Sequence, residues 1–120
     1  MALDAIDYTQ ISRYDTRIDE FTETGCSASI AANRISHHLG LEGLSEVVNT
    51  ACSSVFVALE RAIDALNKGR CDQAIVCGAQ LNLDPHTFTS LQKNLFLSQT
   101  GHTQPFDQEA NGYIRGEGLG

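Results

Sequence analysis

The sequence predicts an α/β fold, and two observations lead to that prediction. A short β-branched run from Glu46 to Thr50 is followed by a long helical pattern that begins near Ser53. A second compact apolar run, Ala74 to Val76, comes directly after that helix. Strand, helix and strand in this order indicate a βαβ unit, whose crossover is expected to be right-handed.

The region before this unit is expected to hold one firm helix. The first 25 residues are polar and weakly periodic, which predicts a loop with short helical pieces. After Gly25 the pattern sharpens, with Ser27 as an N-cap and Ile30, Ile35 and Leu39 at helical spacing. Gly40 is then expected to end the helix.

The central helix has the clearest pattern in the chain. Asp64 and Lys68 form an i,i+4 pair on its charged face, and Gly69 is placed to end it. Phe56 and Val57 lie off the apolar stripe, which predicts that the first turns are covered on more than one side. The apolar stripe itself consists of Val55, Ala58, Leu59, Ala62, Ile63 and Leu66.

The C-terminal third is expected to be mostly loop. Ala74 to Val76 should form a strand buried on both faces, and Pro85 should open a helix that continues through Leu95. No repeat or linker marks a domain boundary. A parallel sheet needs more strands than this chain supplies, so residues 1–120 are expected to be one partial domain that is truncated.

Composition excludes several classes of function. Hydrophobic residues make up 42% of the chain and charged residues 19%, as in ordinary soluble globular proteins. The net charge of −7 argues against a nucleic acid or an anionic membrane as partner. No apolar run is long enough to cross a bilayer and no signal peptide is evident, so a cytoplasmic location is expected.

The four cysteines contain no CxxC pair, and this argues against a zinc site and against a disulfide framework. His37 and His38 fall in the last turn of a predicted helix, where surface histidines are common, and no third ligand stands at a motif spacing. No bound metal is expected.

Cys52 lies at the junction between the first predicted strand and the central helix, a position that suits a nucleophile. Unpaired N–H groups and the positive end of the helix dipole both stabilise a thiolate there. Ala51 and Ser53 are small enough for the sharp turn of a nucleophile elbow. The Cys52 N–H can supply one oxyanion donor, and no second donor is identifiable. Local physics leaves open another interpretation, in which Cys52 is a small buried packing residue.

The motif around this cysteine resembles a known family. "TACSS", Thr50 to Ser54, is similar to the active-site motif of β-ketoacyl synthase domains of polyketide and fatty-acid synthases. The resemblance runs from about Gly25 to Gly120 and rests on several motifs in the family's order. These motifs are "SIAANRIS" and "GLEGLSE" upstream, and "CDQAIVCGAQLNLDP", "LS", "PFD" and "ANGYIRGEGLG" downstream.

The resemblance implies a thiolase-type α/β/α/β/α sandwich, of which this chain would be part of the N-terminal half, truncated at both ends. It implies that Cys52 accepts an acyl group from the phosphopantetheine arm of an acyl carrier protein, and that no cofactor is bound directly. A decarboxylating malonyl unit would then condense with the Cys52 thioester. Family members dimerise through the strand near the nucleophile, here Glu46 to Thr50, and "RGEGLG" would be a loop that supports the active-site floor.

The chain departs from the family pattern at a few positions. Asn49 stands where many members have Asp, and Leu44 where proline is common. Asn111 replaces a frequent Asp, a form similar to synthases served by a separate acyltransferase. The family's two catalytic histidines belong to motifs that these 120 residues lack, and neither His86 nor His102 stands in such a context. The chain alone is therefore expected to be inactive in condensation.

Two other functions stay open. A non-catalytic or decarboxylase-only relative would act as an interaction module, although such relatives often replace the cysteine that is intact here as Cys52. A cysteine hydrolase is disfavoured, because no His or Asn stands in a catalytic context for one.

Overall fold

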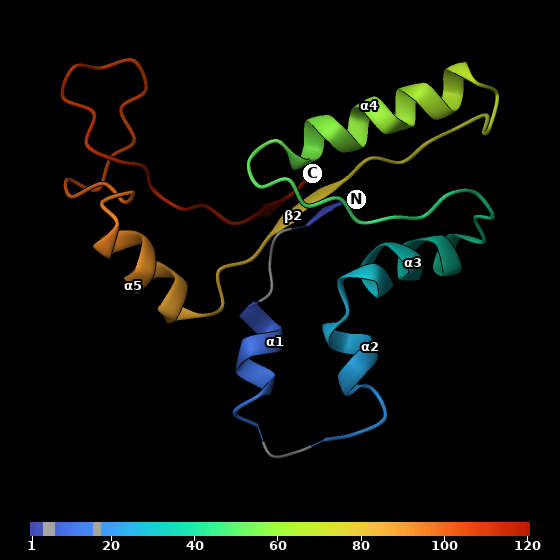
Figure 1. Cartoon of the computed structure of the whole chain (residues 1–120), viewed down its shortest axis with the longest axis horizontal. Helices are drawn as coiled ribbons and strands as arrows, with labels where there is room; N and C mark the ends of the chain where they lie inside the picture. Colours follow the sequence, from blue (N-terminus) through green and yellow to red (C-terminus); the bar gives the residue numbers. More distant parts are fainter. Residues whose placement is uncertain (4–6, 16–17) are drawn as a thin grey trace.

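The computed structural model describes residues 1–3, 7–15 and 18–120. They form a thin layer of 48 × 43 × 17 Å with a radius of gyration of 17.4 Å (Figure 1). A compact domain of this length would have a radius of gyration of roughly 14 Å. The described residues therefore enclose little core, and the buried apolar side chains are small or medium in size: Ala2, Ala32, Val48, Ala58 and Leu97.

Three short strands cross the centre of the molecule, where both chain termini also lie (Figure 1). They are β1 (Ala2–Leu3), β2 (Gly78–Gln80) and β3 (Gly118–Leu119), in that spatial order. β1 runs parallel to β2, with Ala2 opposite Gly78, and β3 runs antiparallel to β2, with Gln80 opposite Gly118. The sheet is therefore mixed.

The first predicted strand is shorter than expected. Within Glu46 to Thr50, pairing with another strand is confined to Val48, which makes an isolated parallel bridge with Ala2. The Val48 N–H donates to the Met1 carbonyl at 2.8 Å, and the Leu3 N–H donates to the Val48 carbonyl at 3.3 Å. Val48, α4 (Ser54–Asn67) and β2 thus keep the predicted strand, helix, strand order with parallel strands, while β1 is inserted between them. A two-residue strand carries no periodic signal in the sequence.

The second predicted strand is wrong in position and in burial. Residues 74–76 precede β2, and Ile75 keeps 58% of its surface exposed. Continuous apolar runs are buried on both faces only where helices cover both faces of a sheet. The described residues supply no such cover at Ile75.

The helices match the sequence closely. The described part of the N-terminal stretch contains α1 (Asp7–Ser12) and α2 (Thr22–Cys26), as expected; residues 4–6 and 16–17 lie outside the described residues. α3 (Ala28–Leu39) follows Ser27, whose hydroxyl pairs with Ser29 Oγ and caps no helical N–H. Gly40 adopts the left-handed φ of 64° that a helix C-terminus favours.

α5 (Pro85–Lys93) begins as predicted and ends earlier than predicted. The Asp84 side chain accepts a hydrogen bond from the His86 N–H at 2.9 Å and caps the helix. Leu95 lies beyond the helix end with a φ of 59°. The last predicted apolar position is therefore not helical.

α4 packs on β1 through a narrow contact. Ala58 is buried against the sheet, but Phe56 is 71% exposed, so the predicted cover over the first turns of this helix is absent from the described residues. Gly69, with a φ of 62°, follows the helix end as predicted. The predicted pair of Asp64 and Lys68 is confirmed at 2.7 Å.

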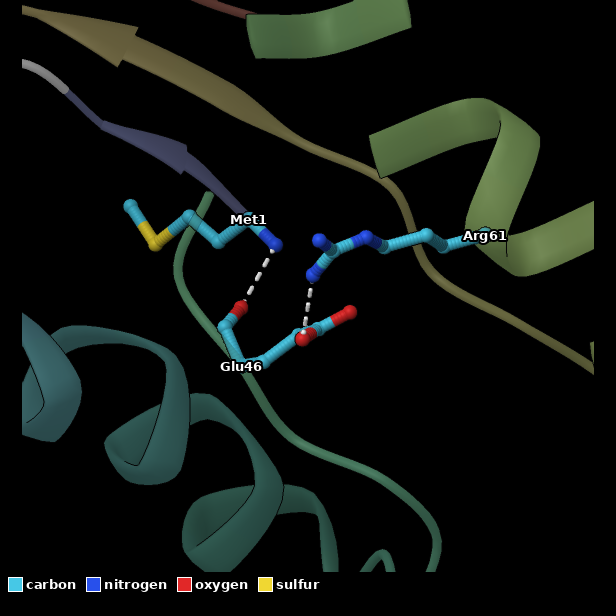
Figure 2. A network of polar contacts seen from close by, with 3 residues as sticks. All are labelled: Met1, Glu46 and Arg61. Carbon is cyan, nitrogen blue, oxygen red and sulfur yellow. Dashed lines mark hydrogen bonds and ion pairs between the residues drawn. The ribbon is translucent and has the colours of Figure 1, made fainter. Parts of the chain in front are cut away.

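A polar network of Met1, Glu46 and Arg61 ties together the start of the chain, the run before Cys52 and α4 (Figure 2). The Met1 amino group donates to the Glu46 carbonyl at 2.9 Å, and Arg61 on α4 pairs with the Glu46 carboxylate at 2.7 Å. The run before Cys52 is therefore held between β1 and α4.

Candidate active site

Cys52 is exposed and carries a free thiol at the predicted strand-to-helix junction. Ser53 follows it as the N-cap residue of α4, and Ser54 is the first helical residue. The interpretation of Cys52 as a buried packing residue is therefore wrong. Cys26, Cys71 and Cys77 are free and partly buried, as expected for packing positions.

The turn that presents Cys52 contains a left-handed residue. Ala51 has a φ of 55°, a conformation that costs a non-glycine residue roughly 1–2 kcal/mol. The Asn49 side chain accepts a hydrogen bond from the Ala51 N–H at 3.1 Å and holds this turn. The expected sharp bend is confirmed, with the left-handed residue one position before the cysteine.

The two serines after Cys52 fix the turn from its other side. Ser54 is 6% exposed; its hydroxyl accepts from the Thr50 N–H at 2.9 Å and donates to the Ala51 carbonyl at 2.6 Å. The Ser53 hydroxyl donates to the Thr50 carbonyl at 2.8 Å. Both hydroxyls are thus engaged with the backbone of the turn, and the thiol is the reactive group that remains exposed.

Cys52 lies at the edge of a hollow of about 370 Å³. The hollow is shallow and open to solvent over most of its extent. Cys52, Ser54 and Val55 line one side, and residues of all three strands line the others. Gly116, Glu117 and Gly118 also contribute to the lining, so part of the loop "RGEGLG" faces the same hollow as the cysteine.

A second group of motif residues meets away from the hollow, where residues 96–98 pair with residues 111–113 through an isolated parallel bridge between Leu97 and Tyr113. We call this contact the crossing. The Ser98 N–H donates to the Tyr113 carbonyl and the Tyr113 N–H to the Phe96 carbonyl, both at 3.0 Å. The Ser98 hydroxyl donates to Asn111 Oδ1 at 2.8 Å.

Gly112 permits this close approach. Its φ is 139°, and a Cβ built there would lie 2.5 Å from backbone atoms of Leu97 and Ser98. The sequence motifs "LS" and "ANGY" are therefore parts of one contact, which the linear order of the motifs does not reveal.

The other candidate positions hold no site. His37, His38, His86 and His102 are exposed. Within residues 1–3, 7–15 and 18–120, no group of three His, Cys, Asp or Glu side chains could hold a metal ion. In the same part of the chain, no helix has both the length and the apolar character needed to cross a membrane.

Comparison with known proteins identifies the family. Residues 2–120 match the family described as "Beta-ketoacyl synthase, N-terminal domain". The chain belongs to the β-ketoacyl synthase family. The resemblance carried by the motif around Cys52 is thereby confirmed, and it extends further toward the N-terminus than Gly25.

The relatives are polyketide synthases and related synthetases. The chain is 45% identical over 113 residues to tenellin synthetase of Beauveria bassiana (strain ARSEF 2860), covering 93% of this chain and 3% of that protein. It is 42% identical over 100 residues to the non-reducing polyketide synthase ascC of Acremonium egyptiacum, covering 83% of this chain and 5% of that protein. The chain thus spans a few per cent of the length of these relatives.

A solved ketosynthase has the same fold. The ketosynthase from module 6 of the bacillaene synthase of Bacillus subtilis 168 is 37% identical, with a TM-score of 0.77. The match covers 86% of this chain and 19% of that one. The predicted α/β class and the thiolase-like fold are therefore confirmed.

Proposed function

We propose that this chain supplies the nucleophile-bearing part of a ketosynthase domain that catalyses decarboxylative condensation in polyketide biosynthesis. The observation that carries the proposal is an exposed thiol, Cys52, held on a fixed turn at the edge of a hollow. Membership of a condensing-enzyme family supports this assignment.

The proposed reaction starts at Cys52 Sγ. The thiolate attacks the carbonyl carbon of an acyl thioester delivered on an acyl carrier protein, and the carrier thiol leaves. A malonyl thioester then loses CO₂, and the resulting carbanion attacks the Cys52 thioester carbonyl. A carbon–carbon bond forms, the Cys52 thiolate leaves, and the β-ketoacyl product stays on the carrier. The main-chain N–H groups of the turn are candidates to stabilise the oxyanion of each addition.

Acid and base groups for these steps are proposed to come from outside residues 1–120. No histidine lines the hollow among the residues that the structure describes. The radius of gyration and the small core support the view that these residues form part of a larger domain. We therefore expect residues 1–120 alone to form no β-ketoacyl product.

The proposed partners are an acyl carrier protein and a second copy of the domain. Val48 bridges β1, which places the Glu46 to Thr50 run at one edge of the sheet. An edge strand offers unpaired N–H and C=O groups to a partner strand. This position supports the expected dimer contact.

Acyl loading tests the proposal. The complete polypeptide that contains this sequence is incubated with an acyl thioester, digested, and searched by mass spectrometry for acylated peptides. We expect the acyl group on Cys52, and its loss after iodoacetamide treatment or in Cys52→Ala. Cys71→Ala is the matched control and should load normally. Full loading in Cys52→Ala would refute the proposal, and CO₂ release from a malonyl thioester without acyl loading would favour the decarboxylase-only relative.

A further inference from the structure

The part of the lining of the hollow that residues 116–118 form is tied to Asn82 by two polar contacts. Glu117 Oε1 accepts a hydrogen bond from the Asn82 N–H at 2.7 Å. The Asn82 side-chain amide donates to the Gly116 carbonyl at 3.0 Å. We call this pair of contacts the clasp. It joins two segments that are 34 and 35 residues apart in the chain.

The backbone ladder does not hold this part of the wall. The pairing of β2 with β3 stops at Gln80 and Gly118. Beyond that point, no backbone hydrogen bond joins residues 81–83 to residues 115–117 in the described chain. Beyond the end of the β2–β3 pairing, the clasp therefore connects the two segments.

On its C-terminal side the loop is anchored by the pairing of β3 with β2, in which Gly118 lies opposite Gln80. Gly116 and Gly118 lack side chains, so Glu117 is the residue of this wall that can hold it through a side chain. On the preceding side, the Arg115 guanidinium lies 5.0 Å from the Phe88 ring centroid on α5. The main chain of residues 116 and 117 thus lies between the Arg115–Phe88 contact and the paired strand β3, and the clasp holds it through side chains.

We propose that Glu117 and Asn82 are positioning residues that set the width of the hollow and thereby select the acyl group that Cys52 accepts. This inference rests on the proposed function of Cys52. Glu117 acts through the main chain of residues 116–118, because its carboxylate is already bound to the Asn82 N–H.

The test measures acyl selectivity in the complete polypeptide. Acyl thioesters of increasing chain length are used to load Cys52, and kcat and KM are determined for each. We expect Glu117→Ala to change the ratio of kcat/KM between the longest and the shortest substrate by roughly tenfold, mainly through KM. Glu117→Gln retains a carbonyl acceptor at the same place and should stay close to the wild-type ratio.

Two controls separate this effect from a general loss of structure. Glu109→Ala removes an exposed carboxylate from outside the hollow and should leave the ratio unchanged. Alkylation of Cys52 by iodoacetamide, which needs no fitted wall, should proceed at the wild-type rate in Glu117→Ala. If that variant fails to fold, Asn82→Ala provides the second test, since it loses the contact to Gly116 and keeps the backbone donor.

Each outcome has a distinct meaning. An unchanged ratio in the folded clasp variant, with normal loading of Cys52, overturns this inference and leaves the proposed function intact. An equal change in Glu109→Ala overturns it as well. Wild-type protein that loads no acyl group on Cys52 overturns the proposed function, and this inference with it.

Discussion

The Cys52 turn and the crossing are both irregular segments held by side chains, but they are built over different distances in the sequence. In the turn, every contact described joins residues two to four positions apart, as between Thr50 and Ser54. In the crossing, Ser98 contacts residues 13 and 15 positions away, and the approach depends on the missing side chain of Gly112.

The difference predicts which of the two regions should tolerate amino-acid substitutions. A local turn can lose one hydrogen bond and keep the others, because short separations cost little chain entropy. At Gly112 in the crossing, no other contact can compensate for an added side chain, because two backbone segments meet there. We therefore expect the largest single effect at Gly112, and smaller effects from the loss of one hydroxyl group in either region.

Gly112→Ala should be the most damaging single change. The added Cβ would lie 2.5 Å from the backbone of Leu97 and Ser98. We expect the free energy of unfolding to fall by about 3 kcal/mol or more, measured by urea denaturation of the complete polypeptide. Gly43→Ala, where nothing lies within 4 Å, is the matched control. Equal free energies of unfolding for the two variants would contradict the view that the close backbone approach at Gly112 limits substitution there.

Ser54→Ala tests the turn. It leaves the Thr50 N–H without its hydroxyl acceptor and removes one of the two donors to the Ala51 carbonyl, which keeps the Ser54 N–H at 3.0 Å. We expect a loss of about 2 kcal/mol in unfolding free energy and a changed rate of Cys52 alkylation. Ser53→Ala, at an exposed position, should have the smaller effect. The reverse order of the two serines would contradict the account of the turn.

Ser98→Ala tests the polar part of the crossing without adding atoms to it. The hydroxyl donates to Asn111 and accepts from the Thr100 and His102 N–H groups at 3.3 Å. These contacts are exposed, so we expect a loss of about 1 kcal/mol. A loss as large as that of Gly112→Ala would mean that the hydroxyl, and not the close backbone approach, holds the crossing.

Asp64 gives the smallest expected effect, and it depends on pH. A hydrogen bond from Lys68 lowers the pKa of Asp64 below its usual value of 3.8. The ionised carboxylate is thus favoured in the folded state, so its contribution is present above about pH 4 and is lost as the pH falls further. We expect the helical circular dichroism of Asp64→Asn to fall less than that of the wild type between pH 5 and about pH 2. Identical acid profiles would show that the pair contributes nothing.

Local signals in the sequence predicted most of what the structure contains. α3, α4 and α5 have periodic apolar faces and recognisable caps, and the turn at Cys52 is coded by its own small and polar residues. The strands were harder to predict from the sequence. β1 has only two residues, and the run around Ile75 is apolar but exposed. The clasp could not be predicted, because no local pattern links Asn82 to Glu117.

Three glycines of the hollow, Gly78, Gly116 and Gly118, have a consequence for how this sequence can change over time. An added Cβ would meet nothing within 4 Å at Gly116 or Gly118, and only the Ala2 Cβ at 3.9 Å at Gly78. A single nucleotide change converts any glycine codon into an alanine codon. Descendants of this gene can therefore acquire a methyl group at three separate points around the hollow without a collision among the described residues. If the hollow selects the acyl group as we propose, these positions are where its shape can change while the fold is retained.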